Sequence, residues 1–194
     1  MYEYFKGKLV EKTPADAVIE CNGVAYILQI SLQTFSKIKD QEEVKLFTHL
    51  VVKEDSHTLF GFADQGERAI FRQLILVSGV GANTARVILS SMNTDEVYNA
   101  IIMNNVGALQ AVKGIGAKTA QRIILDLKDK ISKGEQVSEI FSNSHNTTKE
   151  EALSALVMLG FAKQAADKAL QKIIESQGFT IKVEDLVRLA LKIL

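Results

Sequence analysis

The 194-residue sequence predicts an α+β protein of several domains, in which a small β-barrel precedes a helical domain and a separate three-helix module. Three observations predict this fold class. Apolar residues alternate with polar ones in the first 62 residues, which is the period of half-buried strands. A short unit with two glycines then occurs twice, 35 residues apart. After a polar stretch, apolar residues recur at helical spacing as far as the C-terminus.

Residues 1–62 are expected to form five or six short strands. Alternation is clearest along residues 5–9 and 44–50, and Asn22-Gly23 between two apolar runs is a strong signal for a β-hairpin. So many strands in so short a segment favour a small barrel, of either the five-stranded oligonucleotide-binding (OB) form or the SH3-like form. Core packing, rather than base stacking, is the expected role of Phe5, Tyr26, Phe47, Phe60 and Phe62.

Residues 63–131 are expected to form a helical domain that contains both copies of the repeat. Each copy has an apolar helix, a Gly-apolar-Gly turn and a second helix, and the two turns are Gly79-Val80-Gly81 and Gly114-Ile115-Gly116. Glycine permits a positive φ and lets a partner approach the backbone closely, while the central apolar residue can point inward. The pattern is that of the helix-hairpin-helix motif, written twice.

The turn chemistry indicates phosphate binding. The first turn of each following helix has unpaired N–H groups and the positive end of the helix dipole. A dinucleotide fingerprint would need a third glycine where Thr84 and Thr119 stand. The phosphate loop of nucleotide hydrolases would need Gly directly before Lys, but Ala117 separates Gly116 from Lys118. The residues expected to contact a nucleic-acid backbone are Gly79, Val80, Gly81, Ala82, Asn83, Thr84, Lys113, Gly114, Ile115, Gly116, Ala117, Lys118, Thr119 and Arg122.

The charge balance limits how such binding can work. The chain has 23 basic and 23 acidic residues, and residues 63–131 lean basic with eight against six. Bulk electrostatic attraction therefore cannot supply most of the affinity. Positioned backbone amides and a few cations, such as Lys113, Lys118 and Arg122, would have to supply it.

Composition also narrows the remaining classes. No segment approaches 18 apolar residues and the N-terminus lacks the apolar core of a signal peptide, so we expect a cytoplasmic protein without a membrane partner. The single Cys21 is expected to be a small core residue. The three histidines show no Cys/His spacing suited to zinc, and neither a metal nor a cofactor is expected.

The C-terminal part is expected to be a linker followed by a helical module. Residues 132–148 are rich in Ser, Asn and Thr and predict a flexible linker. In residues 149–194, a capping box from Thr148 to Glu151 begins the first of three helices and Gly160 ends it. So small a module leaves apolar residues exposed, which suits docking to a protein partner. The apolar residues that mark the helices are Leu153, Leu156 and Val157, then Ala165, Ala169, Leu170, Ile173 and Ile174, then Leu186, Leu189, Ala190 and Ile193.

In this order of domains the chain resembles the RuvA family, the DNA-binding subunits of the bacterial Holliday-junction branch-migration complex. The resemblance covers essentially the whole chain, although some members read Pro where Ala82 stands. It favours the OB-like form of the barrel and a UBA-like C-terminal module. The stretches that carry it most strongly are Phe47–Phe62, Val77–Ser90, Ala111–Lys130 and Ala155–Phe161.

The resemblance implies a non-catalytic protein that binds four-way (Holliday) junction DNA without reading its sequence. It implies a homotetramer, or an octamer of two tetramers, in which repeated hairpins hold the duplex arms by their phosphates and weak sites become strong through multivalency. The family's partners are the RuvB ATPase, which RuvA stimulates, and the RuvC resolvase in a larger complex.

Two further sets of residues take roles from the resemblance. Glu54 and Asp55 lie at the tip of an expected hairpin, where the residues alone favour a solvated turn because too few carboxylates converge for a metal nuclease. In the family they match an acidic pin at the centre of the junction. The apolar positions that match RuvB contacts are Leu156, Leu159, Phe161 and Leu191.

Two other classes of function stay open. A helix-hairpin-helix subunit of a DNA repair nuclease or glycosylase would need a catalytic Asp or Lys, for which Asp126 is the only candidate. At helical spacing from Lys130, Asp126 is more simply expected in a surface ion pair. A single-strand-binding barrel fused to a scaffold would need exposed aromatic residues.

Overall fold

The computed structural model describes residues 2–39, 41–132, 151–177 and 183–194. It divides into two compact units, Met1–Val137 and Ser138–Leu194. Nearly all of the predicted linker, and Thr148 of the predicted capping box, lie outside the described residues.

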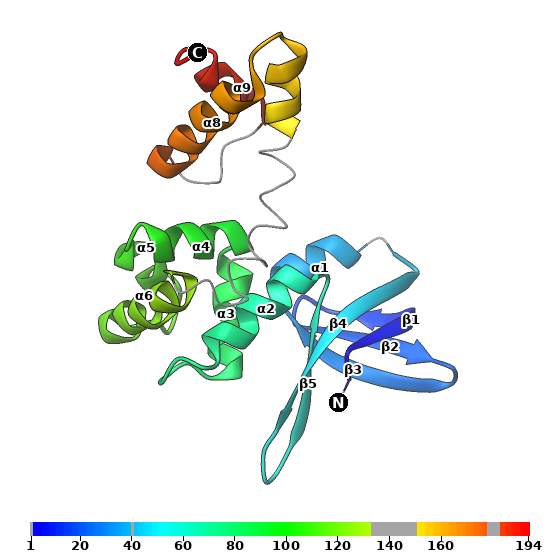
Figure 1. Cartoon of the computed structure of the whole chain (residues 1–194). Helices are drawn as coiled ribbons and strands as arrows, with labels where there is room; N and C mark the ends of the chain where they lie inside the picture. Colours follow the sequence, from blue (N-terminus) through cyan, green and yellow to red (C-terminus); the bar gives the residue numbers. More distant parts are fainter. Residues whose placement is uncertain (1, 40, 133–150, 178–182) are drawn as a thin grey trace. The chain divides into compact units, whose positions relative to one another are not determined.

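The N-terminal part of the first unit is a closed barrel with the strand order β1-β2-β3-β5-β4, which confirms the predicted OB-like barrel (Figure 1). Neighbouring strands are antiparallel, except that β3 and β5 are parallel. Asn22 and Gly23 form the predicted turn with φ of 51° and 83°. Strands β4 and β5 run on past the body of the barrel as a long hairpin (Figure 1). The strands are β1 (Tyr4–Lys12), β2 (Asp16–Cys21), β3 (Val24–Ile30), β4 (Glu43–Val52) and β5 (His57–Phe62).

The aromatic residues of the barrel pack as expected, but in two places. Phe5 is buried in the barrel core and stacks on Tyr26 with the ring centroids 4.3 Å apart. Phe60 and Phe62 are also buried, but they pack against Phe71 of helix α2 (Gln65–Leu74). These two rings therefore join the barrel to the helical domain. Phe47 is half-buried beside Lys45 and Arg68.

Helix α1 (Leu32–Ile38), between β3 and β4, was not predicted. It is only seven residues long, too short for an apolar period to stand out. The Ser31 side chain caps it by accepting a hydrogen bond from the Thr34 amide, and Thr34 and Ile38 are buried. The helix contacts α3 (Ala82–Ser91) and so helps to fix the helical domain on the barrel.

The helical domain contains the two predicted helix-hairpin-helix motifs, built from α2 and α3 and from α5 (Val106–Gln110) and α6 (Ala117–Ser132). Helix α4 (Thr94–Ile102) connects them and begins with a capping box between Asn93 and Glu96. Because α6 contacts α2, α4 and α5, both motifs share one packed domain.

The second unit is a small helical module. Residues 151–158 are helical and are followed by α8 (Lys163–Gln177) and α9 (Val183–Ala190). Gly160 ends the first helix with φ of 95°, as predicted. The sequence assigned Ile193 to the third helix, but α9 ends at Ala190 and Ile193 lies exposed in the turn that follows. The buried core consists of Ala152, Leu156, Ala166, Ala169, Leu170, Ile173, Ile174, Leu186 and Ala190.

Candidate nucleic-acid interface

The two Gly-x-Gly turns have the same backbone. Gly79 and Gly114 have φ of 89° and 91°, a conformation that favours glycine. Val80 and Ile115 are buried, which confirms that the central residues point inward. Each central amide donates to the carbonyl three residues earlier, at 3.0 and 3.1 Å. The two turns therefore share their backbone geometry as well as their sequence pattern.

Helix α3 begins differently from other helices of the first unit. Helices α1, α2, α4 and α5 each have an N-terminal side chain, from Ser31, Asp64, Asn93 and Asn105, that accepts an amide hydrogen bond. Helix α3 has Gly81 as its N-cap residue, and no side chain in the described part of the chain caps it.

The glycine start leaves several amides without an intrahelical acceptor. The first hydrogen bond of α3 runs from the Ala85 amide to the Gly81 carbonyl at 2.9 Å, so the amides of residues 82–84 precede it. Helix α6 starts in the same way, with the Ala120 amide bonded to the Gly116 carbonyl at 3.0 Å. These amides are available to an anion.

The second glycine of each turn is not required by the fold itself. Gly81 has φ of −85°, which any residue can adopt. A Cβ atom at Gly81 or Gly116 would meet no atom of the described residues within 4 Å. The missing side chain therefore leaves open space against the backbone, where a partner can approach.

The predicted cations cluster on the second hairpin. Lys113, Lys118 and Arg122 are all exposed. Neither lysine makes an ion pair within the described residues. The Arg122 guanidinium Nη1 donates to Ser78 Oγ at 3.1 Å, and the Ser78 carbonyl oxygen lies 3.5 Å from the same nitrogen. Ser78 was not singled out from the sequence, because nothing local indicates a partner 44 residues away.

The first hairpin has one cation, Arg86, in its second helix, and this side chain is hydrogen-bonded to the barrel. Arg86 Nη1 donates to the carbonyl oxygens of Ile30 at 3.2 Å and Ala15 at 3.4 Å. Leu32, the first residue of α1, links that helix to α3, since its amide donates to Ser90 Oγ at 3.1 Å. Helix α3 is thus fixed to the barrel by Arg86 and to α1 by Ser90.

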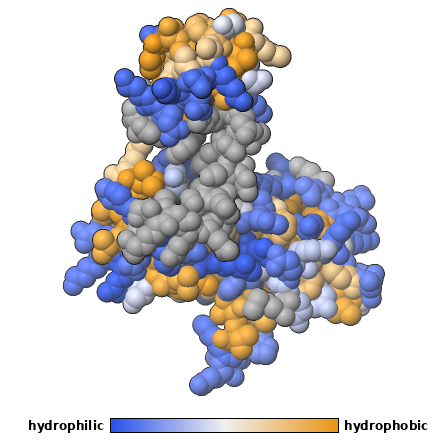
Figure 2. Space-filling model, in the orientation of Figure 1, coloured by the Kyte–Doolittle hydropathy of each residue, from blue (hydrophilic) through white to orange (hydrophobic). Residues whose placement is uncertain are grey.

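The acidic residues Glu54 and Asp55 are exposed in the turn between β4 and β5. The turn is closed by a hydrogen bond from the Lys53 amide to the Ser56 carbonyl at 2.8 Å. Ser56 Oγ donates to Asp55 Oδ1 at 3.2 Å. Within the described residues neither carboxylate makes an ion pair, and Figure 2 shows a hydrophilic tip on the projecting hairpin. The two carboxylates are therefore exposed together at the end of the projecting hairpin.

Glu67 is a buried carboxylate where α1 meets α2. Its oxygens accept hydrogen bonds from the hydroxyls of Ser31 and of Thr34, the latter at 2.7 Å. Burial raises the pKa of Glu67, and these hydrogen bonds oppose the shift. Next to it, buried Arg68 forms an ion pair with Glu3 at 2.5 Å. The sequence did not predict these contacts of Glu67 and Arg68, here called the joint. They hold α2, the helix that leads into the first hairpin.

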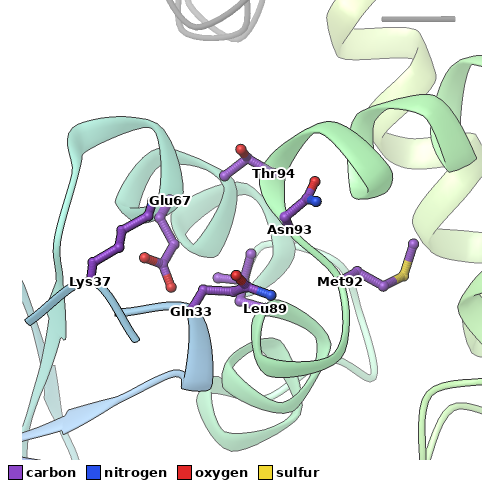
Figure 3. Close-up of a pocket in the computed structure, with 7 residues that line it drawn as sticks. All are labelled: Gln33, Lys37, Glu67, Leu89, Met92, Asn93 and Thr94. Carbon is purple, nitrogen blue, oxygen red and sulfur yellow. The ribbon is translucent and has the colours of Figure 1, made fainter. Parts of the chain in front are cut away.

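A small pocket lies beside this joint (Figure 3). None of the residues predicted to form a site lines it, and an ion pair of 2.6 Å between Lys37 and Asp64 lies at the joint. The pocket therefore belongs to the junction between the barrel and the helices. Its lining residues are Gln33, Lys37, Glu67, Leu89, Met92, Asn93 and Thr94.

The predicted partner-binding residues of the second unit divide into two groups. Leu159 and Leu191 are 60% and 44% exposed, and Phe161 is half-buried against the core. Leu156 has no exposed surface, so a partner contact at this position does not fit the structure. Met158, which was not predicted as a contact, is 86% exposed because it lies two residues along the helix from buried Leu156. Apolar side chains also reach the surface of this unit in Figure 2.

Two further expectations can be compared with the structure. Asp126 does not pair with Lys130, whose Nζ donates instead to Gln73 Oε1 at 3.2 Å. The expected surface ion pair is therefore wrong. In the described ranges, no cluster of three or more His, Cys, Asp and Glu side chains could hold a metal ion. None of the helices in those ranges could span a bilayer.

A closed OB-like barrel that carries two glycine-started helix-hairpin-helix motifs defines a protein of the barrel and tandem helix-hairpin-helix class. Three protein-family models match the chain and agree with this class. Residues 1–61 match the RuvA N terminal domain, residues 71–129 match the SAM-like helix-hairpin-helix tandem, and residues 148–194 match the RuvA C-terminal domain.

Whole-chain relatives narrow the class further. The chain is 54% identical to the Holliday junction branch migration complex subunit RuvA of Christiangramia forsetii and 48% identical to that of Flavobacterium psychrophilum, over 99% of both chains in each case. It is 42% identical to the RuvA subunit of Azobacteroides pseudotrichonymphae over the full length of both. The chain therefore belongs to the RuvA family.

Proposed function

We propose that this protein binds four-way DNA junctions by the phosphates of their arms, without reading the base sequence and without catalysing a reaction. The observation that carries the proposal is the pair of helices, α3 and α6, that begin at open glycines. Their first amides lack intrahelical acceptors, and the space beside Gly81 and Gly116 is free. The identity of the substrate, a four-way junction, is inferred from the relatives, which are named for Holliday junction branch migration.

Phosphate contacts alone fix position on DNA but carry no sequence information. The contact residues proposed here are those of the two turns and helix starts, together with Lys113, Lys118 and Arg122. Each hairpin offers a few amides and at most a few cations, so one chain binds weakly. A homotetramer around a fourfold junction multiplies these sites, and a second tetramer on the other face would make an octamer.

The acidic hairpin gives the proposal its specificity for junctions. Glu54 and Asp55 repel phosphates, so they do not belong to a surface that grips a continuous duplex. At the centre of a tetramer they would lie where the strands exchange, and would keep the strands apart there. Their exposure, and their lack of ion pairs in the described part of the chain, support this role.

The second unit is proposed to dock on the RuvB ATPase and to stimulate it, with the RuvC resolvase joining a larger complex. Exposed Leu159, Met158 and Leu191 support an apolar contact. Leu156 supports it indirectly, because it packs the core from which these side chains project. The proposed domains are residues 1–62, 63–131 and 149–194, with residues 132–148 as the linker.

The glycines provide the test of DNA binding. Gly81→Ala with Gly116→Ala adds two methyl groups in open space, so the fold should hold while binding to labelled four-way junctions falls at least several-fold. Gly79→Ala with Gly114→Ala is the comparison for stability: a side chain at positive φ costs roughly 1–2 kcal/mol at each site, so this variant should unfold more easily than the Gly81/Gly116 variant. Forked and single-stranded DNA are compared in parallel. Unchanged junction binding by the stable Gly81/Gly116 variant, or a preference for single strands, would count against the proposal.

The acidic tip is tested by Glu54→Gln with Asp55→Asn. Removal of the repulsion should preserve or tighten junction binding and change the rate of branch migration with the ATPase present. Duplex binding serves as the control and should not tighten more than junction binding does. A simple loss of junction binding would contradict the assignment.

A further inference from the structure

The two hairpins differ at the residue that precedes the Gly-x-Gly turn. In the second hairpin this residue is Lys113, an exposed cation next to the open amides. In the first hairpin it is Ser78, which has no charge. The other two cation positions of the second hairpin, Lys118 and Arg122, correspond to Asn83 and Val87. By its own residues, the first hairpin has no free cation at these positions.

The structure brings a cation to the first hairpin from the second motif. Arg122 belongs to α6, yet its Nη1 donates to the hydroxyl of Ser78 at 3.1 Å. One guanidinium nitrogen therefore lies within hydrogen-bond distance of the residue that corresponds to Lys113 in the other hairpin. Both Arg122 and Ser78 are exposed, so a ligand can reach them.

Three other basic residues of the helical domain make hydrogen bonds away from the first turn. Arg86 donates to barrel carbonyls, Lys128 Nζ donates to Asn104 Oδ1 at 3.0 Å, and Lys130 Nζ donates to Gln73 Oε1 at 3.2 Å. Only Arg122, of these four, lies against the first turn. A guanidinium has five donors, and the contact with Ser78 engages one nitrogen, which leaves donors for a phosphate oxygen.

We propose that Arg122 completes the phosphate site of the first hairpin, and that Ser78 is the positioning residue that holds its guanidinium there. This inference rests on the proposed function, in that the ligand is a backbone phosphate of a duplex arm. It goes further by assigning a cation of one motif to the site of the other. The two hairpins then become one unit with coupled sites, in which the first depends on a side chain of the second.

The test moves the charge between hairpins in the full-length protein. Arg122→Ala should weaken binding to a plain duplex several-fold and reduce the salt slope by about 0.9 for each phosphate that is no longer neutralised. Ser78→Lys, added to Arg122→Ala, copies the Lys113 arrangement into the first hairpin and should restore affinity and slope. Gln121→Lys in the same Arg122→Ala background is the matched control, because it places the same charge one residue away on α6, and it should not restore them.

The role of Ser78 is tested by a double-mutant cycle. Ser78→Ala should weaken duplex binding less than Arg122→Ala does, and should have no further effect once Arg122 is removed. Ser78→Thr keeps the hydroxyl and should bind as the natural protein does. Thermal unfolding should not separate these variants, which excludes a loss of fold as the cause.

Three outcomes would overturn the inference: full binding by Arg122→Ala, rescue by Gln121→Lys but not by Ser78→Lys, or additive effects of Ser78→Ala and Arg122→Ala. Failure of the proposed function would look different, because the natural protein would then bind neither duplex nor junction DNA.

Discussion

The two hairpins share a backbone but differ in what surrounds it. Gly79 and Gly114 have nearly the same φ, and Val80 and Ile115 are buried to nearly the same extent. Around the first hairpin, polar side chains face the barrel, and its helix is held there by Arg86. Around the second, Lys113 and Lys118 are exposed and unpaired within the described residues, and Arg122 reaches across to the first.

The difference indicates a division of roles within one repeated unit. The first motif joins the barrel to the helical domain through α2 and α3, so it fixes the proposed phosphate sites relative to the barrel that carries the acidic hairpin. The second motif supplies the exposed cations Lys113, Lys118 and Arg122. A repeated backbone can therefore take two roles, because side-chain environment, not turn geometry, decides what each copy contributes.

The largest effect should come from the buried centres of the hairpins. Ile115→Ala removes a side chain that is 6% exposed and should cost about 2–4 kcal/mol of unfolding free energy. Val80→Ala should cost less, by about the 0.8 kcal/mol of one methylene group. Urea unfolding of both variants measures the difference. A larger loss at Val80 would show that attachment to the barrel makes the first hairpin the less tolerant of the two.

A smaller effect should separate the hairpins in DNA binding. Lys113→Ala with Lys118→Ala should lower the salt slope for duplex binding by about 1.8 per chain, at about 0.9 for each phosphate contact. Asn83→Ala is the matched control in the first hairpin, at the position that corresponds to Lys118, and should leave the slope unchanged. The slope is read from titrations at several salt concentrations. Equal slopes for the lysine variant and the natural protein would show that Lys113 and Lys118 do not neutralise phosphates, so the two hairpins would not differ in this respect.

The smallest effect concerns the attachment of the first motif and depends on pH. Burial raises the pKa of Glu67, so the folded state favours the neutral carboxyl. Its contribution to stability is complete below the ordinary value of 4.5 and is lost as the pH rises through the raised pKa. Glu67→Gln stays neutral, so its stability relative to the natural protein should increase as the pH rises from 4.5 towards 7.

Urea unfolding at several pH values checks this expectation. The pKa of Glu3 is lowered by its hydrogen bond to Arg68, and that group acts in the opposite direction. It is present in both proteins and therefore cancels in the difference. If the natural protein instead became more stable than the variant as the pH rose, the hydrogen bonds from Ser31 and Thr34 would outweigh burial.

Much of the fold follows from short-range patterns. Period-two alternation and Asn22-Gly23 predicted the strands of the barrel, and the two Gly-x-Gly turns predicted the helical domain. Helix α1 escaped prediction because seven residues carry too little periodicity. Leu156 and Met158 show that local patterns also fail to identify which apolar residues of the second unit are exposed to a partner. Both are apolar residues of one helix, but only packing decides that Leu156 is buried and Met158 exposed.

The sequence by itself determined the repeated turn. A glycine at positive φ, an apolar centre and a helix start without a side-chain cap are local properties of a few adjacent residues. Only the tertiary structure decided which charged side chain lies beside which turn. Arg86 is held by the barrel, and Arg122 meets Ser78 across 44 residues of chain. The physical reason is range: backbone conformation depends on neighbours in sequence, whereas the partner of a long charged side chain depends on what folding brings within about 3 Å of it.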